Sequence, residues 1–200
     1  MSDKGKETAI DIGAGWGEYF VDRAKENPDK TFILLDSYFP NIRRLPPNLR
    51  LVRWVSDSDS GLPFKSSSVD EANINFLMGE IKSKEDKPEG ETIEMAHKKY
   101  ERIIKDLLKC LKKGAILQII DARENIFAIE EILKRNNFTI KTKPTKLENM
   151  NQTRWTKTFY DVFVKSGRPE EDSFALPMKL TATLKEDPDK VVRPDSPFSI

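Results

Sequence analysis

Cysteine and histidine are almost absent from this 200-residue chain, which contains one of each. Cys110 alone cannot form an internal disulfide, and residues 1–8 lack the apolar core of a secretory signal. We therefore expect a reducing, cytoplasmic environment. His97 lies outside the apolar stripe of its predicted helix, so we expect a solvated side chain. No metal site is expected.

Long apolar runs and a strong net charge are also missing. No run approaches the roughly 18 to 20 apolar residues needed to cross a bilayer, so we expect no contact with a membrane. The 34 basic and 33 acidic residues leave a net charge of +1, which argues against binding nucleic acid through the overall field but allows a local basic face. The length fits one domain, predicted at residues 1–167. Residues 168–200 are expected to form a Pro-rich, partly irregular tail, with 174–184 as its only structured candidate.

The sequence does contain a regular alternation of strand-sized apolar runs and amphipathic helices. The runs lie at residues 8–12, 31–35, 49–55, 69–76 and 115–120. Helical spacing follows the first run and recurs over residues 100–111 and 125–136, where Phe127, Ile132 and Leu133 are expected to pack on the sheet. Two late strands, at 139–143 and 158–165, have no helical pattern between them and should pair antiparallel at the sheet edge. The pattern predicts an α/β fold.

A glycine turn, Gly13-x-Gly15-x-Gly17, follows the first strand and is preceded by Asp11. Such a turn places backbone N–H groups and a helix N-terminus where α/β sheets bind ligands. The glycines alone also fit a tight turn that binds nothing. Asp11 favours a ligand, because a phosphate site has no use for a carboxylate here, whereas the ammonium group of an amino acid does.

Asp36 ends the second strand, nineteen residues after Gly17. A carboxylate at this position can accept hydrogen bonds from both hydroxyls of a ribose. Its alternative role is to cap the following turn. The glycine loop and Asp36 together favour a ribose-containing ligand.

This combination resembles the class I S-adenosylmethionine-dependent methyltransferases over about residues 8–165. Their first motif, acid-x-Gly-x-Gly-x-Gly, is matched by Asp11, Gly13, Gly15 and Gly17. The resemblance implies a Rossmann-like seven-stranded sheet in the order 3-2-1-4-5-7-6, with strand 7 antiparallel and helices on both faces. A dehydrogenase is the alternative for this fold, but its Gly-x-Gly-x-x-Gly spacing fails at Glu18.

The resemblance also implies S-adenosylmethionine as the cofactor and assigns residues to it. The expected cofactor-binding residues are Asp11, Gly13, Ala14, Gly15, Gly17, Asp36, and Asp57 or Asp59. The last two stay alternatives for the contact with adenine, because Ser58 occupies the place of the family's acid upstream of Leu62-Pro63-Phe64. Asp70, in contrast, is expected to be a structural residue that opens the fourth strand.

Methyl transfer from a sulfonium requires mainly alignment of acceptor, methyl and sulfur. After the fourth strand, the Asn75 carboxamide could hold an amine or ring nitrogen while Phe76 stacks on a planar acceptor; equally, Asn75 could cap the loop and Phe76 fill the core. Ile-Asn-Phe resembles this segment in tRNA guanine-N7 methyltransferases, although their Pro-Asp-Pro-Trp is absent. Phe-x-x-Gly resembles the ribosomal RNA adenine methyltransferases linked to aminoglycoside resistance.

Arg154, Trp155 and Lys157 precede the predicted last strand, where both RNA families place acceptor-facing residues. Trp155 could stack on a base while the two cations meet phosphate, or the segment could be an edge loop with one half-buried Trp. The sequence therefore predicts a methyltransferase acting on a nitrogen of an RNA base. The alternatives are a small-molecule methyltransferase and a non-catalytic module that binds S-adenosylmethionine.

Overall fold

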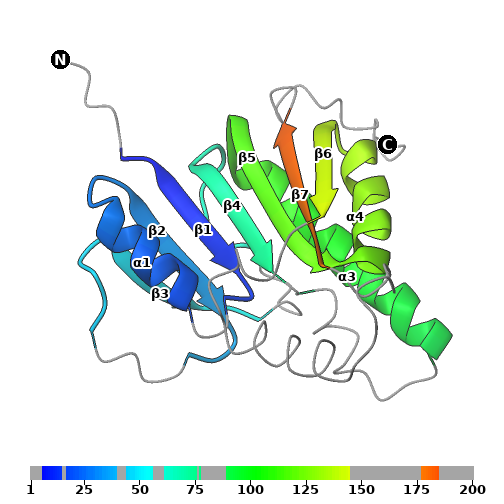
Figure 1. Cartoon of the computed structure of the whole chain (residues 1–200), viewed down its shortest axis with the longest axis horizontal. Helices are drawn as coiled ribbons and strands as arrows, with labels where there is room; N and C mark the ends of the chain where they lie inside the picture. The colour runs from blue at the N-terminus through cyan, green and yellow to red at the C-terminus, as the bar shows by residue number, and fades with distance from the viewer. Residues whose placement is uncertain are drawn as a thin grey trace, which may run out of the picture.

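A seven-stranded sheet forms the centre of the computed structural model (Figure 1). The structure describes residues 6–14, 17–39, 44–55, 61–75, 77, 89–144 and 177–184. The strands are β1 (Thr8–Ile12), β2 (Thr31–Asp36), β3 (Leu49–Arg53), β4 (Val69–Asn75), β5 (Leu111–Ala122), β6 (Phe138–Pro144) and β7 (Pro177–Leu184). Their order is β3-β2-β1-β4-β5-β7-β6, and β7 runs antiparallel to both neighbours. The predicted fold class and strand order are confirmed.

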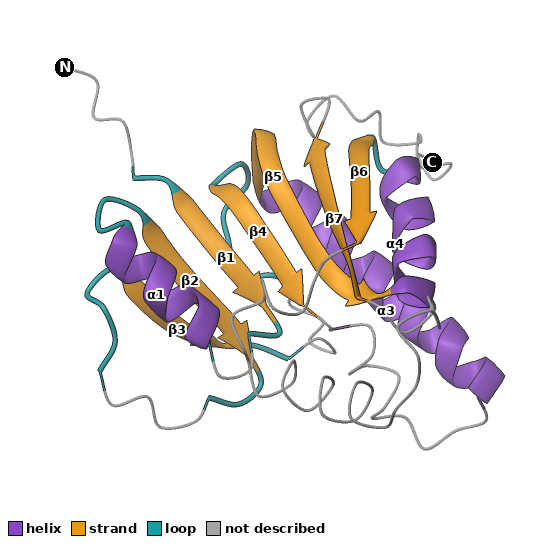
Figure 2. Cartoon of the chain, in the orientation of Figure 1, coloured by secondary structure: helices purple, strands orange, loops and turns teal. Residues whose placement is uncertain are grey.

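Helices lie on both faces of the sheet, as Figure 2 shows. The described helices are α1 (Glu18–Glu26), α3 (Glu89–Cys110) and α4 (Arg123–Arg135). On one face, α3 and α4 bury the larger apolar cluster against the sheet; its helical members include Tyr100, Ile103, Ile104, Leu107, Ile126, Ile129 and Leu133. On the other face, Phe20 and Ala24 of α1 pack with Phe32, Leu34 and Leu49. Among the described residues, no helix is both long and apolar enough to cross a membrane.

The last strand of the sheet lies later in the chain than predicted. The sequence placed it at 158–165, which is outside the described residues, but the strand between β5 and β6 is Pro177–Leu184. Leu180, Ala182 and Leu184 bury one face of this strand, while Thr181 and Thr183 point to the other. Residues 158–165 form a mostly apolar run, whereas 177–184 alternate apolar and polar residues. Both patterns are typical of a strand, so only the pairing with β5 and β6 selects between them. The seven-stranded sheet thus extends to Leu184, beyond the predicted boundary at residue 167 and into the predicted tail.

Phe127 of α4 does not pack on the sheet, contrary to the prediction. Its side chain is 51% exposed, and the guanidinium of Arg123 lies 5.8 Å from its ring centroid. Ile126 and Ile129 are fully buried instead. The helical face that meets the sheet therefore contains Ile126 and Ile129 in place of Phe127, and the expected contacts of Ile132 and Leu133 are confirmed.

Candidate active site

The turn after β1 is held tightly against the end of β2. The N–H groups of Gly13 and Ala14 both donate to the carbonyl oxygen of Leu35, at 2.9 and 3.1 Å. Gly13 has a φ of 71°, and a Cβ at this position would lie 2.9 Å from Cδ1 of Leu77. A side chain here would be strained and would displace Leu77, so the position requires glycine.

Gly17 begins α1 with a φ of 66°. Its N–H donates to the carbonyl of Ala14, and its own carbonyl accepts from Phe20 and Val21. As the N-cap residue, Gly17 offers no side-chain cap, and the backbone donors and positive dipole end of this helix N-terminus face the turn. Gly15, the middle glycine of the motif, lies outside the described residues.

Asp11 is a buried carboxylate without a complete set of partners. Its side chain is 3% exposed, and its Oδ1 has no hydrogen-bond partner. Burial raises the pKa of this carboxyl to about 8; Arg23 opposes the shift, while Asp36 and Glu71 add to it. An unsatisfied buried carboxylate is costly, so Asp11 is suited to receive a cation or a hydrogen-bond donor from a ligand.

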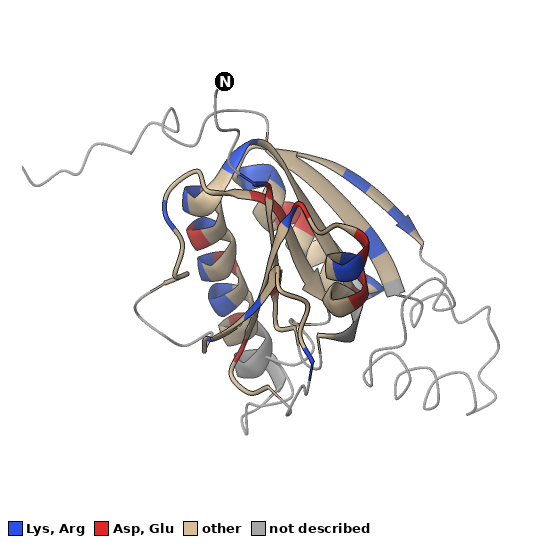
Figure 3. Ribbon diagram, turned by 90° about the vertical axis from the view of Figure 1, so that its left-hand side faces the viewer, with Lys and Arg blue, Asp and Glu red and all other residues tan. Residues whose placement is uncertain are grey.

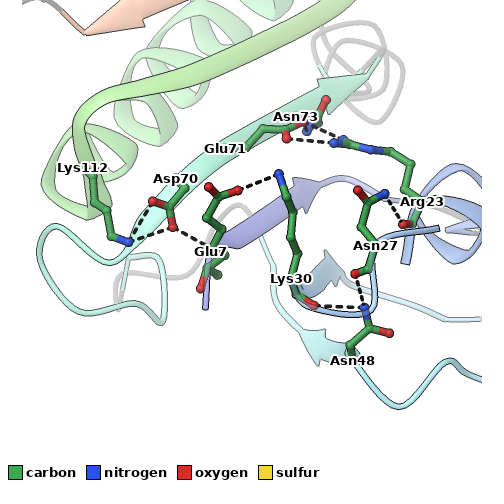
Figure 4. Close-up of polar contacts among 10 residues, drawn as sticks. Glu7, Arg23, Asn27, Lys30, Asn48, Asp70, Glu71, Asn73 and Lys112 are labelled. Atoms are coloured by element: carbon green, nitrogen blue, oxygen red, sulfur yellow. Dashed lines mark hydrogen bonds and ion pairs between the residues drawn. The ribbon is translucent and has the colours of Figure 1, made fainter. Parts of the chain in front are cut away.

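An ion pair joins α1 to β4 next to Asp11. Arg23 donates from Nη1 and Nη2 to the two carboxylate oxygens of Glu71, at 2.6 and 2.8 Å, and Asn73 Nδ2 donates to Glu71 Oε1 at 3.0 Å (Figure 4). Although burial alone would raise the pKa of Glu71, the hydrogen bonds from Arg23 and Asn73 bring it below its usual value. Asp11 is the register partner of Asn73.

This ion pair was not predicted from the sequence, although the sequence of β4 indicates a polar face. Glu71, Asn73 and Asn75 alternate with Ala72 and Ile74, the pattern of a central strand with one polar face. The partner of Glu71, in contrast, comes from a helix 48 residues away. The local pattern therefore reveals the polar face but not Arg23.

Asp36 performs the turn-capping role that the sequence left open. Its Oδ1 accepts from the Tyr38 N–H at 3.1 Å and from the Ser37 hydroxyl at 3.3 Å. The carboxylate is half-buried and stands at the carboxyl end of β2, beside the glycine turn that β2 holds through Leu35. Capping and ribose binding are compatible, because one carboxylate offers about four acceptor sites.

The segment predicted to contact adenine has closely held ends. Trp54 Nε1 donates to the Gly61 carbonyl at 3.0 Å, which bridges the two sides of residues 56–60, and Trp54 and Leu62 are both buried. Asp57 and Asp59 themselves lie outside the described residues, so both remain alternatives.

The predicted acceptor residues are only partly described. Asn75 is half-buried at the carboxyl end of β4 and pairs in register with Ile120 of β5. Phe76, Arg154, Trp155 and Lys157 lie outside the described residues. Among the residues that the structure covers, no three His, Cys, Asp or Glu side chains gather as metal ligands.

Asp70 has the structural role that the sequence predicted. It accepts from the Thr8 N–H and from Lys112 Nζ, each at 2.8 Å (Figure 4). These bonds join β4 to the start of β1 and to β5 at the amino end of the strands, opposite the glycine turn.

Known proteins resemble this chain in sequence and in fold. No family model matches it. A bifunctional methyltransferase of Rickettsia felis is 28% identical over 179 residues, which are 84% of this chain and 32% of that protein. The chain thus spans about a third of the length of this relative.

Two solved structures cover most of the chain. A SAM-dependent methyltransferase of Methanosarcina mazei matches with a TM-score of 0.58 and 15% identity, covering 90% of this chain and 94% of that one. The 16S rRNA methyltransferase KamB matches with a TM-score of 0.60 and 14% identity, covering 90% and 89%. The chain therefore has the fold of the S-adenosylmethionine-dependent methyltransferases, and the cofactor and enzyme class predicted from the sequence agree with these relatives.

Proposed function

We propose that this protein is an S-adenosylmethionine-dependent methyltransferase that acts on a nitrogen of an RNA base. The observation that carries the cofactor is Asp11, a buried carboxylate whose Oδ1 lacks a partner beside a glycine turn. The amino-acid end of S-adenosylmethionine offers an ammonium group, which would satisfy this oxygen. Gly13, Ala14, Gly15 and Gly17 would lie along the same end of the cofactor.

The adenosine end would extend toward the ends of β2 and β3. Asp36 would accept the ribose hydroxyls, and Asp57 or Asp59 would face the adenine. The bound group supplies an activated methyl on a sulfonium, so the protein's main task is to position the acceptor and exclude water. Asn75 and Phe76 would position the acceptor base, and Arg154, Trp155 and Lys157 would contact the RNA around it.

The cofactor assignment predicts proton release on binding. Because the pKa of Asp11 is about 8 in the free protein, its carboxyl is mostly protonated at pH 7, and an ammonium partner would favour the carboxylate. Calorimetry at pH 7 in buffers of different ionisation enthalpy should report close to one proton released per S-adenosylmethionine bound. Asp11→Asn should abolish this release. Binding without proton release in the unaltered protein would contradict the assignment.

Asp36→Ala tests the ribose contact. Hydrogen bonds to a charged group are worth about 1.5 to 3 kcal/mol, so affinity for S-adenosylmethionine should fall about ten- to a hundredfold. Asp70→Ala is the matched control, since it removes a carboxylate at the other end of the strands and should change stability but not affinity. Equal affinities in the Asp36 variant and the unaltered protein would remove Asp36 from the site.

RNA is favoured as the acceptor by the likeness of the fold to a 16S rRNA methyltransferase and by the resemblance of residues 74–79 to RNA enzymes. Incubation with labelled donor, beside total RNA in one reaction and a metabolite extract in another, tests this choice. Label in the RNA fraction supports it, whereas label only among metabolites favours the small-molecule methyltransferase. No transfer to either, with the donor still bound, favours the non-catalytic module.

A further inference from the structure

Across β4, β5, β7 and β6, one face of the sheet is polar and is covered by no described helix on its outer side; it begins at Asn75, the proposed acceptor residue. Register pairs place Asn75 of β4, Ile120 of β5, Lys179 of β7 and Lys143 of β6 in one row across four strands. Directly paired residues share a face of the sheet. The neighbouring row contains Asn73, Gln118, Thr181 and Lys141. Both rows therefore lie on the α1 side of the sheet, where Arg23 meets Glu71.

The outer part of this face is open to solvent. The helices α3 and α4 pack on the opposite face, and α1 packs against β2 and β3. In Figure 1, α1 covers one end of the sheet, and no described helix lies in front of β5, β7 and β6. Lys141 and Lys143 are exposed, and Ile116 of β5 is 43% exposed. The outer edge of this face is therefore accessible to a partner.

The described charged residues on this part of the face are all basic. Its described members on β5, β7 and β6 include three lysines and no acid; they are Ile116, Gln118, Ile120, Lys179, Thr181, Thr183, Thr139, Lys141 and Lys143. The nearby acid Glu71 is already engaged by Arg23. In Figure 3, basic positions follow the strands on the right, the side on which α1 lies.

Lys179 and Lys143 are direct register partners, so their ammonium groups repel each other across the ladder. Lys179 is half-buried, and burial together with Lys143 lowers its pKa. Two facing cations, one of them partly desolvated, form an arrangement that an anion would stabilise.

We propose that the lysine strip, defined as Lys141, Lys143 and Lys179, binds the phosphate backbone of the RNA whose target base is held at Asn75. Neighbouring strands lie about 4.8 Å apart, so Lys179 stands about 10 Å and Lys143 about 15 Å from Asn75 along the row. Phosphates of the nucleotides next to the target base fall within such a span. This inference rests on the proposed function and specifies the surface that its RNA substrate would occupy.

The test compares two double variants of the full chain. Lys141→Gln/Lys143→Gln removes two charges from the strip. Lys98→Gln/Lys105→Gln removes two charges from α3, where both lysines are exposed and pair with acids of their own helix. Lys179→Gln is added as a third variant. The probes are a fluorescent single-stranded oligoribonucleotide of mixed sequence and labelled methyl transfer to total RNA.

Removal of two phosphate contacts should reduce the slope of log affinity against log salt by roughly 1.4, since each contact on a single strand contributes about 0.7. The strip variant should also bind the oligoribonucleotide about tenfold more weakly at low salt and lose transfer to RNA to a similar extent. The α3 variant should match the unaltered protein. Melting temperature and affinity for S-adenosylmethionine should stay unchanged in both.

Failure of the strip and failure of the proposed function give different results. If the unaltered protein methylates RNA and the strip variants keep its salt slope and its kcat/KM, the strip does not contact the substrate. If the unaltered protein transfers label only to metabolites, the RNA function fails and the strip fails with it. A loss of transfer shared equally by the strip and α3 variants would also overturn the proposal, since only net charge would then matter.

Discussion

The two halves of the sheet use the same face in opposite ways. Around β1 and β4 the face holds the buried carboxylate of Asp11, and α1 reaches it through the partly buried Arg23–Glu71 pair. Across β5, β7 and β6 no described helix covers it, and it presents the lysine strip. Under the proposed function, burial makes the first half selective for a small cation-bearing ligand, because an unpaired group there is costly. Exposure makes the second half suitable for a large anionic surface that stays hydrated.

Substitution of Asp11 should produce the largest difference between the two halves of the sheet. Asp11→Asn keeps the shape of the side chain but cannot carry the charge that an ammonium group needs. Breaking a buried charge pair costs about 3 to 5 kcal/mol, so affinity for S-adenosylmethionine should fall at least a hundredfold by calorimetry. RNA affinity measured without the cofactor should not change. A parallel loss of both affinities would mean that the two halves are not independent.

The titration of Asp11 should also appear in the pH dependence of the unfolding free energy of the free protein. Between the usual Asp pKa and the raised value of about 8, the folded state keeps a proton that the unfolded state has lost. Stability therefore falls as pH rises through this window, by up to 1.36 kcal/mol per pH unit for one group.

From pH 6 to pH 8 the Asp11 carboxyl should lower the unfolding free energy of the unaltered protein by roughly 2 kcal/mol. Asp11→Asn lacks the titration, so the difference in unfolding free energy between the two proteins should change in favour of the variant by that amount. Denaturant unfolding at both pH values measures it. Parallel pH profiles would show that Asp11 is ionised throughout.

The Arg23–Glu71 pair should have a smaller effect. Its side chains are 22% and 15% exposed, so the pair lies between surface pairs worth less than about 1 kcal/mol and buried pairs whose disruption costs 3 to 5. Arg23→Met should therefore destabilise the fold by roughly 1 to 2 kcal/mol and lower the melting temperature by about 3 to 6 °C.

Lys25→Met is the control for this experiment, because Lys25 lies on the same helix and its pair with Asp22 is about 60% exposed on both sides. Its melting temperature should stay close to that of the unaltered protein. If both variants melt at the same temperature, the pair does not hold α1 against β4.

Much of the region around the glycine turn was predictable because its determinants are close in sequence. Gly13 and Gly17 adopt positive φ values within a few residues of Asp11, so a short motif is enough to specify the turn. Asp70 was likewise placed by its position at the start of a strand. The roles of Arg23 and Glu71 were not predictable, since their contact depends on how α1 packs on the sheet next to β4.

The sequence by itself determined the alternation of strands and helices, the glycine turn and the identity of its acid, because each depends on neighbouring residues and local backbone geometry. Only the tertiary structure decided that Pro177–Leu184 completes the sheet, that Phe127 faces solvent, and that Asp11 Oδ1 is left without a partner. The same holds for the lysine strip, because Lys179 lies 36 residues after Lys143 in the chain. Alternation with a period of two is common to many segments, so strand pairing is settled by contacts between distant residues rather than by the pattern of either strand alone.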